Sequence, residues 1–392
     1  MRREDQMLGE LAHPRPLRPL LRELRAPVRV AAVGGGTGLP AVLGGLARRR
    51  RGTVPAQVSA VVTTCDDGGS SGKLRRRYGL PSPGDIRNCL VALTPDKNPF
   101  AEIFQHRFPG RTGVGGHTLG NLVLAALAQR LGNFAAAVDC ATRLLGAQGR
   151  VLPATAQRVD LVAQLGDGRV VCGETAIAAA RGRVDRLRLK RSVAASPEAL
   201  EVVADADLLV FGPGSLYTSV IASLLGKGMG AALAACRGWR VLVVNLFTQP
   251  GETDGYDAAD HVRAIQQHFG AVIDAALVHD RPLPARLVSA YAANGARVVT
   301  CDRAALASLG VRTFAADLLG AGEKARHGPD KLARALREIL RSKRESNRGV
   351  PCVESSGTSA SARRLRSSSR VYGVSSIAGT TARGRLSSSA TG

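Results

Sequence analysis

The stretch VRVAAVGGGTGL, residues 28–39, joins a short apolar segment to a glycine-rich turn. Residues 28–33 predict a buried strand, and the residues from Pro40 to Arg51 predict a helix that begins directly after the turn. A strand, a glycine-rich turn and a helix in this order form an anion site of backbone N–H groups. The turn is not a dinucleotide fingerprint, because Leu39 stands where GxGxxG has its last glycine, and no P-loop lysine follows. A tight turn without a ligand is the alternative.

The same alternation continues along the chain. Further strands are expected at residues 58–64, 206–211, 240–245, 275–279 and 297–300, and a last helix at residues 329–341. Strands that alternate with Ala- and Leu-rich helical stretches are typical of βαβ units. The sequence therefore predicts an α/β protein with a Rossmann-like, doubly wound and mostly parallel sheet covered by helices on both faces.

Composition divides the 392 residues into three regions. Residues 1–27 predict an N-terminal extension, and residues 28–344 a single nucleotide-binding α/β domain. Residues 345–392 are rich in Ser and Arg and poor in large apolar residues. Because such a segment buries too little apolar surface to offset its ordering entropy, we expect it to be disordered.

Charge and cysteine usage restrict the class of protein. A net charge of +23 favours anionic ligands in general. Aromatic residues make up only 4% of the chain, which argues against a stacking platform for single-stranded nucleic acid. No uncharged apolar run is long enough to cross a membrane. The 7 cysteines are scattered without a CxxC pair, which indicates a reducing compartment, so we expect a cytoplasmic protein without a membrane or nucleic-acid partner.

The block DDGGSSGKLRRR after the second predicted strand carries the densest chemistry. Asp66 and Asp67 stand at a strand end, where they would accept ligand hydroxyls or hold Mg²⁺. Ser70, Ser71 and Lys73 add phosphate donors, although an exposed turn is the alternative. The three arginines at 75–77 are expected to form a solvated face.

Two further segments open predicted helices. In PSPGDIRNCL, Asp85 is expected to cap a helix, with Arg87 and Asn88 in its first turn; Arg87 would bind phosphate as a fork or serve structure alone. In GGHTLGNLVLAAL, His117 and Asn121 lie one turn apart on one face. A capping or core role is the alternative for His117, and no spacing predicts zinc.

A second strand–turn–helix element begins at Gly212 with GPGSLYTS, and Asn245 and Thr248 follow a later strand. Two glycine loops on one sheet predict a ligand with two anchor points, such as a diphosphate-linked molecule. The candidate ligand-binding residues are Gly34, Gly35, Gly36, Thr37, Gly38, Asp66, Asp67, Ser70, Ser71, Lys73, Asp85, Arg87, Asn88, His117, Asn121, Gly212, Gly214, Ser215, Thr218, Asn245 and Thr248, with Asp66 and Asp67 also as candidate metal ligands. The sequence assigns no catalytic residue.

Seven motifs taken together, GGGTGL, VVTTCDDGGSSGKLR, PGDIRN, FQHRF, GGHTLGN, GPGSLYTS and TQPGETDGY, resemble the gluconeogenesis factor family (YvcK-type). This family lies within the CofD-like superfamily named for 2-phospho-L-lactate transferase. The resemblance implies a cytoplasmic protein that binds a UDP-sugar such as UDP-N-acetylglucosamine, has no assigned reaction, and is required for cell shape and growth on gluconeogenic carbon. It leaves a homo-oligomer and Mg²⁺ as cofactor open.

The transferase branch is the alternative function, in which a phospholactyl group is moved onto a deazaflavin. Its resemblance covers the first glycine loop and the paired aspartates. The continuation GGSSGKLR and the motif PGDIRN instead resemble the gluconeogenesis factor branch. Nucleic-acid binding would rest on charge alone.

Overall fold

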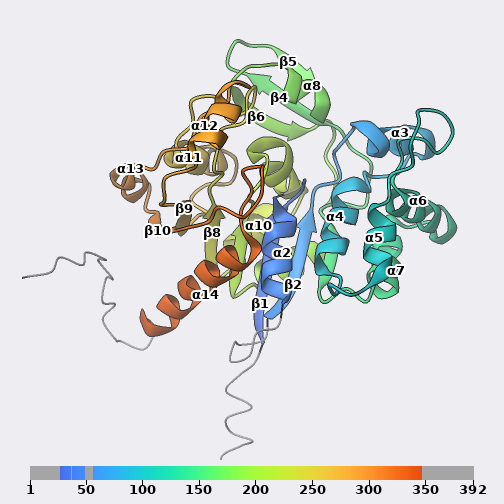
Figure 1. Cartoon of the computed structure of the whole chain (residues 1–392), viewed down its shortest axis with the longest axis horizontal. Helices are drawn as coiled ribbons and strands as arrows, with labels where there is room; N and C mark the ends of the chain where they lie inside the picture. Colours follow the sequence, from blue (N-terminus) through green and yellow to red (C-terminus); the bar gives the residue numbers. More distant parts are fainter. Residues whose placement is uncertain (1–26, 37, 49–55, 347–392) are drawn as a thin grey trace, which may run out of the picture. The chain divides into compact units, whose positions relative to one another are not determined.

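The computed structural model describes residues 27–36, 38–48 and 56–346 (Figure 1). The chain divides into a unit over residues 1–350 and a second unit over residues 351–392. Residues 1–26 of the predicted N-terminal extension, Thr37 and the second unit lie outside the described residues, as does the predicted disordered tail from residue 347 onward.

A seven-stranded sheet in the order β10-β9-β8-β7-β1-β2-β3 forms the centre of the fold. All its strand pairs are parallel, with Val30 of β1 opposite Val58 of β2 and Leu208 of β7. Its strands are β1 (Val28–Gly34), β2 (Ala56–Val62), β3 (Arg150–Pro153), β7 (Leu208–Phe211), β8 (Trp239–Val243), β9 (Ala275–His279) and β10 (Arg312–Ala316).

Helices cover both faces, because alternate strand residues point to opposite sides of the sheet. Val30 and Ala32 of β1 pack in one apolar cluster, whereas Ala31 and Val33 pack in the other. The first cluster is covered by α2 (Leu39–Ala47), α4 (Gly84–Leu93), α5 (Pro99–Gln105), α6 (Leu119–Leu131), α7 (Phe134–Leu144) and α14 (Pro329–Ser346). The second is covered by α9 (Pro197–Ala204), η1 (Leu216–Ile221), η2 (Ala222–Leu224), α10 (Met229–Ala235), α11 (Ala258–Phe269) and α13 (Arg303–Ser308). The predicted doubly wound α/β fold is confirmed.

An antiparallel sheet of three strands in the order β5-β4-β6 is inserted between β3 and α9. It consists of β4 (Leu161–Leu165), β5 (Val170–Cys172) and β6 (Val184–Leu189), with α8 (Glu174–Ala179) after β5. In Figure 1 this insertion lies at one end of the molecule, on the same side as α3 (Gly69–Tyr78). The sequence analysis did not separate this sheet from the parallel one.

Three local expectations need correction. Residues 297–300 were expected to form a strand, but only Val298 is paired there, in an isolated bridge to Phe247. The helix after the second glycine loop was expected from about Val220, but it begins at Leu216 as a π-helical turn. Arg75 was expected on a solvated face, but its side chain is buried against Asp160 at 2.8 Å, because one of three successive helical residues turns toward the protein.

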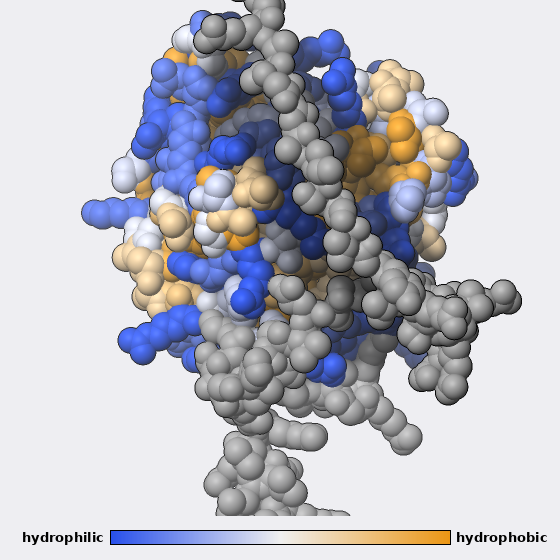
Figure 2. Space-filling model, turned by 90° about the vertical axis from the view of Figure 1, so that its left-hand side faces the viewer, coloured by the Kyte–Doolittle hydropathy of each residue, from blue (hydrophilic) through white to orange (hydrophobic). Residues whose placement is uncertain are grey.

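The surface is mixed in polarity. On the face shown in Figure 2, hydrophilic residues and smaller groups of hydrophobic residues are interspersed. Among the described residues, no helix combines the length and the hydropathy that a membrane span requires. The remaining helix is α12 (Ala285–Ala292), which with Phe247 and neighbouring residues bounds a small separate apolar cluster.

Candidate functional site

The candidate site lies where the strand order of the parallel sheet reverses. The chain proceeds from β1 outward to β2 and β3, and then returns to the other side of β1 with β7. The two loops that follow β1 and β7 are the two glycine-rich turns predicted from the sequence. In open α/β sheets, ligands bind at the carboxyl ends of the strands at such a switch point.

The two glycine loops are in direct contact. A Cβ atom added at Gly38 would lie 2.2 Å from the Pro213 carbonyl oxygen, and one added at Gly34 would lie 3.8 Å from the Gly212 Cα. Gly36 has a φ of +61°, and a Cβ added there would meet only the Ser219 Oγ, at 3.8 Å. The space on the Cβ side of Gly36 is therefore open to a ligand, whereas its N–H and its carbonyl are bonded to Asp85 and Asn88.

The second loop is held by side chains from the end of β8. The Asn245 Oδ1 accepts a hydrogen bond from the Gly214 N–H at 3.1 Å, and its Nδ2 donates to the Gly214 carbonyl at 2.7 Å. The Ser215 Oγ accepts from the Gln249 Nε2 at 2.9 Å. Asn245 therefore positions the loop through both ends of its amide.

The η1 N-terminus, expected to offer donors to a phosphate, is already occupied. The N–H groups of Tyr217 and Thr218 donate to the buried Glu252 carboxylate at 2.7 Å and 2.9 Å. Burial raises the pKa of Glu252. The Thr248 hydroxyl accepts from the Arg297 N–H at 2.9 Å and joins two loop segments. Glu252 was missed in the sequence analysis, although it lies within the TQPGETDGY motif.

The paired aspartates after β2 have separate partners. The Asp66 carboxylate accepts from the Gly68 N–H at 2.9 Å and from the Ser82 hydroxyl at 3.4 Å. The Asp67 carboxylate accepts from the backbone N–H groups of residues 174 and 175, at 3.1 Å and 3.0 Å, and from the Thr175 hydroxyl at 2.5 Å. Asp67 thus ties the inserted sheet to the edge of the parallel sheet.

The described residues contain no group of three or more His, Cys, Asp and Glu side chains that could hold a metal ion. Because the Asp67 carboxylate is satisfied by α8, the pair offers few free oxygen atoms to a shared cation. This geometry gives no support to the expected magnesium site at Asp66 and Asp67, which stays a prediction.

Asp85 lies in the first turn of α4, where Pro83 and not Asp85 is the N-cap residue. A Cβ added at Gly35 would lie 2.5 Å from the Asp85 Oδ2, so the carboxyl packs directly against the first glycine loop. Burial raises the pKa of Asp85 to about 6, against a hydrogen bond from the Gly36 N–H that lowers it. The expected helix cap is therefore a group of the site itself.

A chain of hydrogen bonds connects the remaining predicted residues. The Asn88 Nδ2 donates to the Gly36 carbonyl at 3.3 Å, and the Arg87 guanidinium donates to the Asn88 Oδ1 at 2.6 Å. Arg87 also donates to the Asn121 Oδ1 at 3.1 Å. The Asn121 Nδ2 in turn donates to the Ser70 Oγ at 3.0 Å. One network thus links the first glycine loop to the starts of α3, α4 and α6.

His117 ends this network and lies just before α6. Its Nδ1 is 2.9 Å from the Ser70 Oγ. Burial lowers the pKa of His117, and the nearby cations Lys73 and Arg107 lower it further. Since Ser70 Oγ already accepts from Asn121, its own hydrogen is available to the neutral imidazole. Arg107 was not singled out in the sequence analysis, although it lies within the quoted FQHRF motif.

Glu174 is a further acidic residue that the sequence analysis missed, because it lies in the inserted segment. It begins α8 and is half-buried. Burial raises its pKa to about 7, and the neighbouring carboxylates Asp66, Asp67, Asp85 and Glu252 add to the rise. The site therefore combines carboxyl groups that hold protons near neutral pH with cations on the α6 side.

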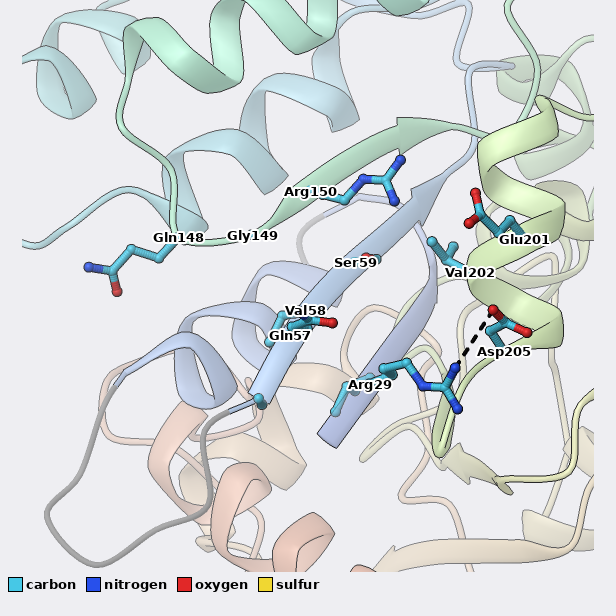
Figure 3. Close-up of a pocket in the computed structure, with 12 residues that line it drawn as sticks. Arg29, Gln57, Val58, Ser59, Gln148, Gly149, Arg150, Glu201, Val202 and Asp205 are labelled. Atoms are coloured by element: carbon cyan, nitrogen blue, oxygen red, sulfur yellow. Dashed lines mark ion pairs between the residues drawn. The ribbon is translucent and has the colours of Figure 1, made fainter. Parts of the chain in front are cut away.

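The amino ends of the strands carry a cavity of about 480 Å³, opposite the candidate site. In Figure 3 its residues come from β1, β2, β3 with the loop before it, and α9 with the residue after it, and none of the predicted site residues lines it. Arg29 in this cavity is paired with Asp205 at 3.6 Å and Asp207 at 3.3 Å. The predicted polar groups gather at the carboxyl edge, so we place the candidate site there.

The fold and the adjoining glycine loops define a Rossmann-like α/β protein with its polar groups collected at a topological switch point. A family model described as 2-phospho-L-lactate transferase CofD matches residues 30–319. The gluconeogenesis factor of Bacillus subtilis (strain 168) is 40% identical over 317 residues, which cover 80% of this chain and 98% of that protein. The gluconeogenesis factor of Halalkalibacterium halodurans is 40% identical over 312 residues, covering 79% and 95%.

A solved structure is similar as well. An X-ray crystal structure of a Bacillus halodurans protein matches with a TM-score of 0.76 and 39% identity, and the match covers 80% of this chain and 100% of that chain. The chain belongs to the gluconeogenesis factor family, within the wider CofD family. The resemblance stated from the seven motifs is confirmed.

Proposed function

We propose that the carboxyl edge of the parallel sheet binds a UDP-sugar, with UDP-N-acetylglucosamine as the first to test. The diphosphate would lie against the loops that follow β1 and β7. The observation that carries this proposal is the direct contact of two glycine loops, with open space beside Gly36 where a side chain would otherwise stand. Glycines at such a turn let phosphate oxygens approach the loop without a side chain in the way.

The carboxyl groups beside the loops suit an anionic ligand only at pH values at which they are protonated. Asp85 and Glu174 have pKa values raised to about 6 and about 7. When protonated, they would donate hydrogen bonds to phosphate or sugar oxygens instead of repelling them. The Asp66 carboxylate would accept a hydrogen bond from a sugar hydroxyl. Ligand affinity should therefore fall as the pH rises above neutral.

In the cell, we propose a regulatory, nucleotide-sugar-binding role in the cytoplasm that supports growth on gluconeogenic carbon and normal cell shape. The family supports the gluconeogenic part of this role, since relatives are named gluconeogenesis factor. The alternative, phospholactyl transfer onto a deazaflavin, is favoured by the description of the matching family model. The segments GGSSGKLR and PGDIRN favour the regulatory branch.

The binding experiment is a thermal-shift and calorimetry panel of UDP-N-acetylglucosamine, UDP-glucose, NAD, GDP and a deazaflavin. A ligand that binds only the folded state raises the melting temperature. The variant Gly36→Asn adds a side chain in the open space, and Asn tolerates a positive φ better than other residues. The matched control is Gly132→Asn, at the end of α6, where φ is +65° and no atom lies within 4 Å.

We expect Gly36→Asn to melt like the unmodified protein and to lose about tenfold or more in UDP-sugar affinity, with no loss in the control. Full affinity in a folded Gly36→Asn protein would show that the site lies elsewhere. In cells, deletion of the gene should impair growth on gluconeogenic carbon and alter cell shape. If the Gly36→Asn gene complements the deletion as well as the unmodified gene does, the cellular role does not depend on this site.

A further inference from the structure

Three cationic side chains converge on the segment before α6. The Arg107 guanidinium donates to the Gly116 carbonyl at 2.7 Å. The Lys73 Nζ would lie 3.9 Å from a Cβ added at Gly116. Arg87 bonds to Thr118 and Asn121 on the same α6 start, and Arg107 is close enough to lower its pKa. Positive groups on α3, α4 and the loop after α5 thus meet at one place.

Among the side chains that the structure describes, in residues 27–36, 38–48 and 56–342, no carboxylate is in ion-pair contact with these cations. The acids that act on Arg87 are Asp85 and Asp66, and both accept hydrogen bonds from other groups. Like charges that lie close together repel one another, so three cations at one place lower the stability of the folded protein unless an anion binds between them.

Arg87 makes the case stronger because it is 7% exposed. Its hydrogen bonds go to neutral oxygens of Thr118, Asn121 and Asn88. Its Nε is buried without a partner. A buried guanidinium normally pairs with a carboxylate or phosphate, because burying an unpaired charge is unfavourable. The fixed position of Arg87 in the network prepares it for such a partner.

We propose that Arg87, Lys73 and Arg107 form a subsite for an oxyanion, a phosphate or a carboxylate, separate from the diphosphate contacts at the glycine loops. The proposal deepens the proposed function and relies on it only for the position of the nucleotide. Arg87 and Arg107 would bind the oxyanion through guanidinium forks and Lys73 as a point charge. The oxyanion would be part of an acidic sugar or belong to a second small molecule.

The test uses two variants of exposed residues, Lys73→Met and Arg107→Gln, and their double variant. The matched control is Arg130→Gln, an exposed arginine in the last turn of the same helix α6. Inorganic phosphate is titrated by calorimetry into the protein alone and into the protein with saturating UDP. UDP-glucuronate and UDP-glucose are compared in the same way, because they differ by one carboxylate.

We expect phosphate to bind with UDP present, and each variant to weaken phosphate binding about tenfold, as loss of one charge-assisted contact does. The UDP affinity of the Arg107→Gln variant and the phosphate affinity of the Arg130→Gln control should each change less than about twofold. A preference for UDP-glucuronate that the double variant abolishes identifies an acidic sugar as the source. Equal affinity for both sugars, with phosphate binding beside them, identifies a second molecule.

The proposal fails if the unmodified protein does not bind phosphate and does not prefer UDP-glucuronate over UDP-glucose. It also fails if the variants bind phosphate as tightly as the Arg130→Gln control does. Failure of the proposed function gives a different result. In that case UDP and UDP-sugars do not bind, while phosphate still binds to the protein alone and is weakened by Lys73→Met and Arg107→Gln.

Discussion

Glu174→Gln should stabilise the ligand-free protein in a pH-dependent manner. Burial first, and then the carboxylates of Asp66, Asp67, Asp85 and Glu252, raise the pKa of Glu174 from 4.5 to about 7. At 1.36 kcal/mol per pKa unit, ionising the folded protein would cost about 3 kcal/mol as an upper figure. Because part of the side chain faces solvent and the acids share protons, we expect about 1–2 kcal/mol.

The sign follows from the proton affinity of the two states. The folded protein holds the Glu174 proton more tightly than the unfolded chain. The resulting stability is fully present below the unfolded value of 4.5 and is lost as the pH rises through about 7. Glutamine has no charge to bury and is close in size. Its advantage over Glu174 should therefore grow from near zero at about pH 4.5 to about 1–2 kcal/mol at about pH 8.5.

The assay is equilibrium urea unfolding of both proteins at several pH values across this range. The matched control is Glu201→Gln, an exposed glutamate on α9 whose change should leave the unfolding free energy nearly constant. A Glu174→Gln protein that is less stable than the unmodified chain at high pH would refute the reasoning. So would a stability difference that is the same at every pH.

Four further predictions concern other parts of the chain. Arg75→Gln should lower the unfolding free energy by about 1–3 kcal/mol in urea titrations, because the partly exposed Asp160 loses its charged partner; a loss within the error of the titration would contradict this. Asn245→Ala should weaken UDP-sugar binding by about tenfold in calorimetry, since both bonds to Gly214 are lost, and unchanged affinity would argue against the loop's role. Purified protein with lactyl-diphosphoguanosine, a deazaflavin and Mg²⁺ should form no phospholactyl product, and detection of coenzyme product would reverse the assignment. Removing residues 347–392 should leave the melting temperature and UDP-sugar affinity unchanged; a drop in either would mean that the segment contributes to the folded unit.

The sequence was most informative where the deciding contacts are local. The strand at residues 28–33 and its glycine turn were predictable, because a short apolar run and the need for glycine act within a few residues. The same holds for the loop at Gly212. Their contact with each other also follows from the fold class, since a doubly wound sheet brings two such loops together where the strand order reverses.

The contacts that complete the site join residues far apart in the chain. Asp67 meets the backbone of Glu174 across 107 residues, and no local pattern announces that pairing. Glu252 reaches the N–H of Tyr217 across 35 residues and fills a helix start that the motif alone suggested was free. Arg75 was misjudged because a run of three arginines suggests a solvated face, although helical geometry turns one of them inward.

Asp67 explains why acidic residues accumulate at an edge proposed to bind an anion. Its carboxylate is engaged by the start of α8, so it holds the inserted sheet against the parallel sheet. That attachment brings Glu174 among other carboxyl groups and raises its pKa to about 7. A proton is therefore retained at the junction near neutral pH, where it reduces the repulsion between the acids. The cations around Gly116 lie on separate elements, α3, α4 and the loop after α5.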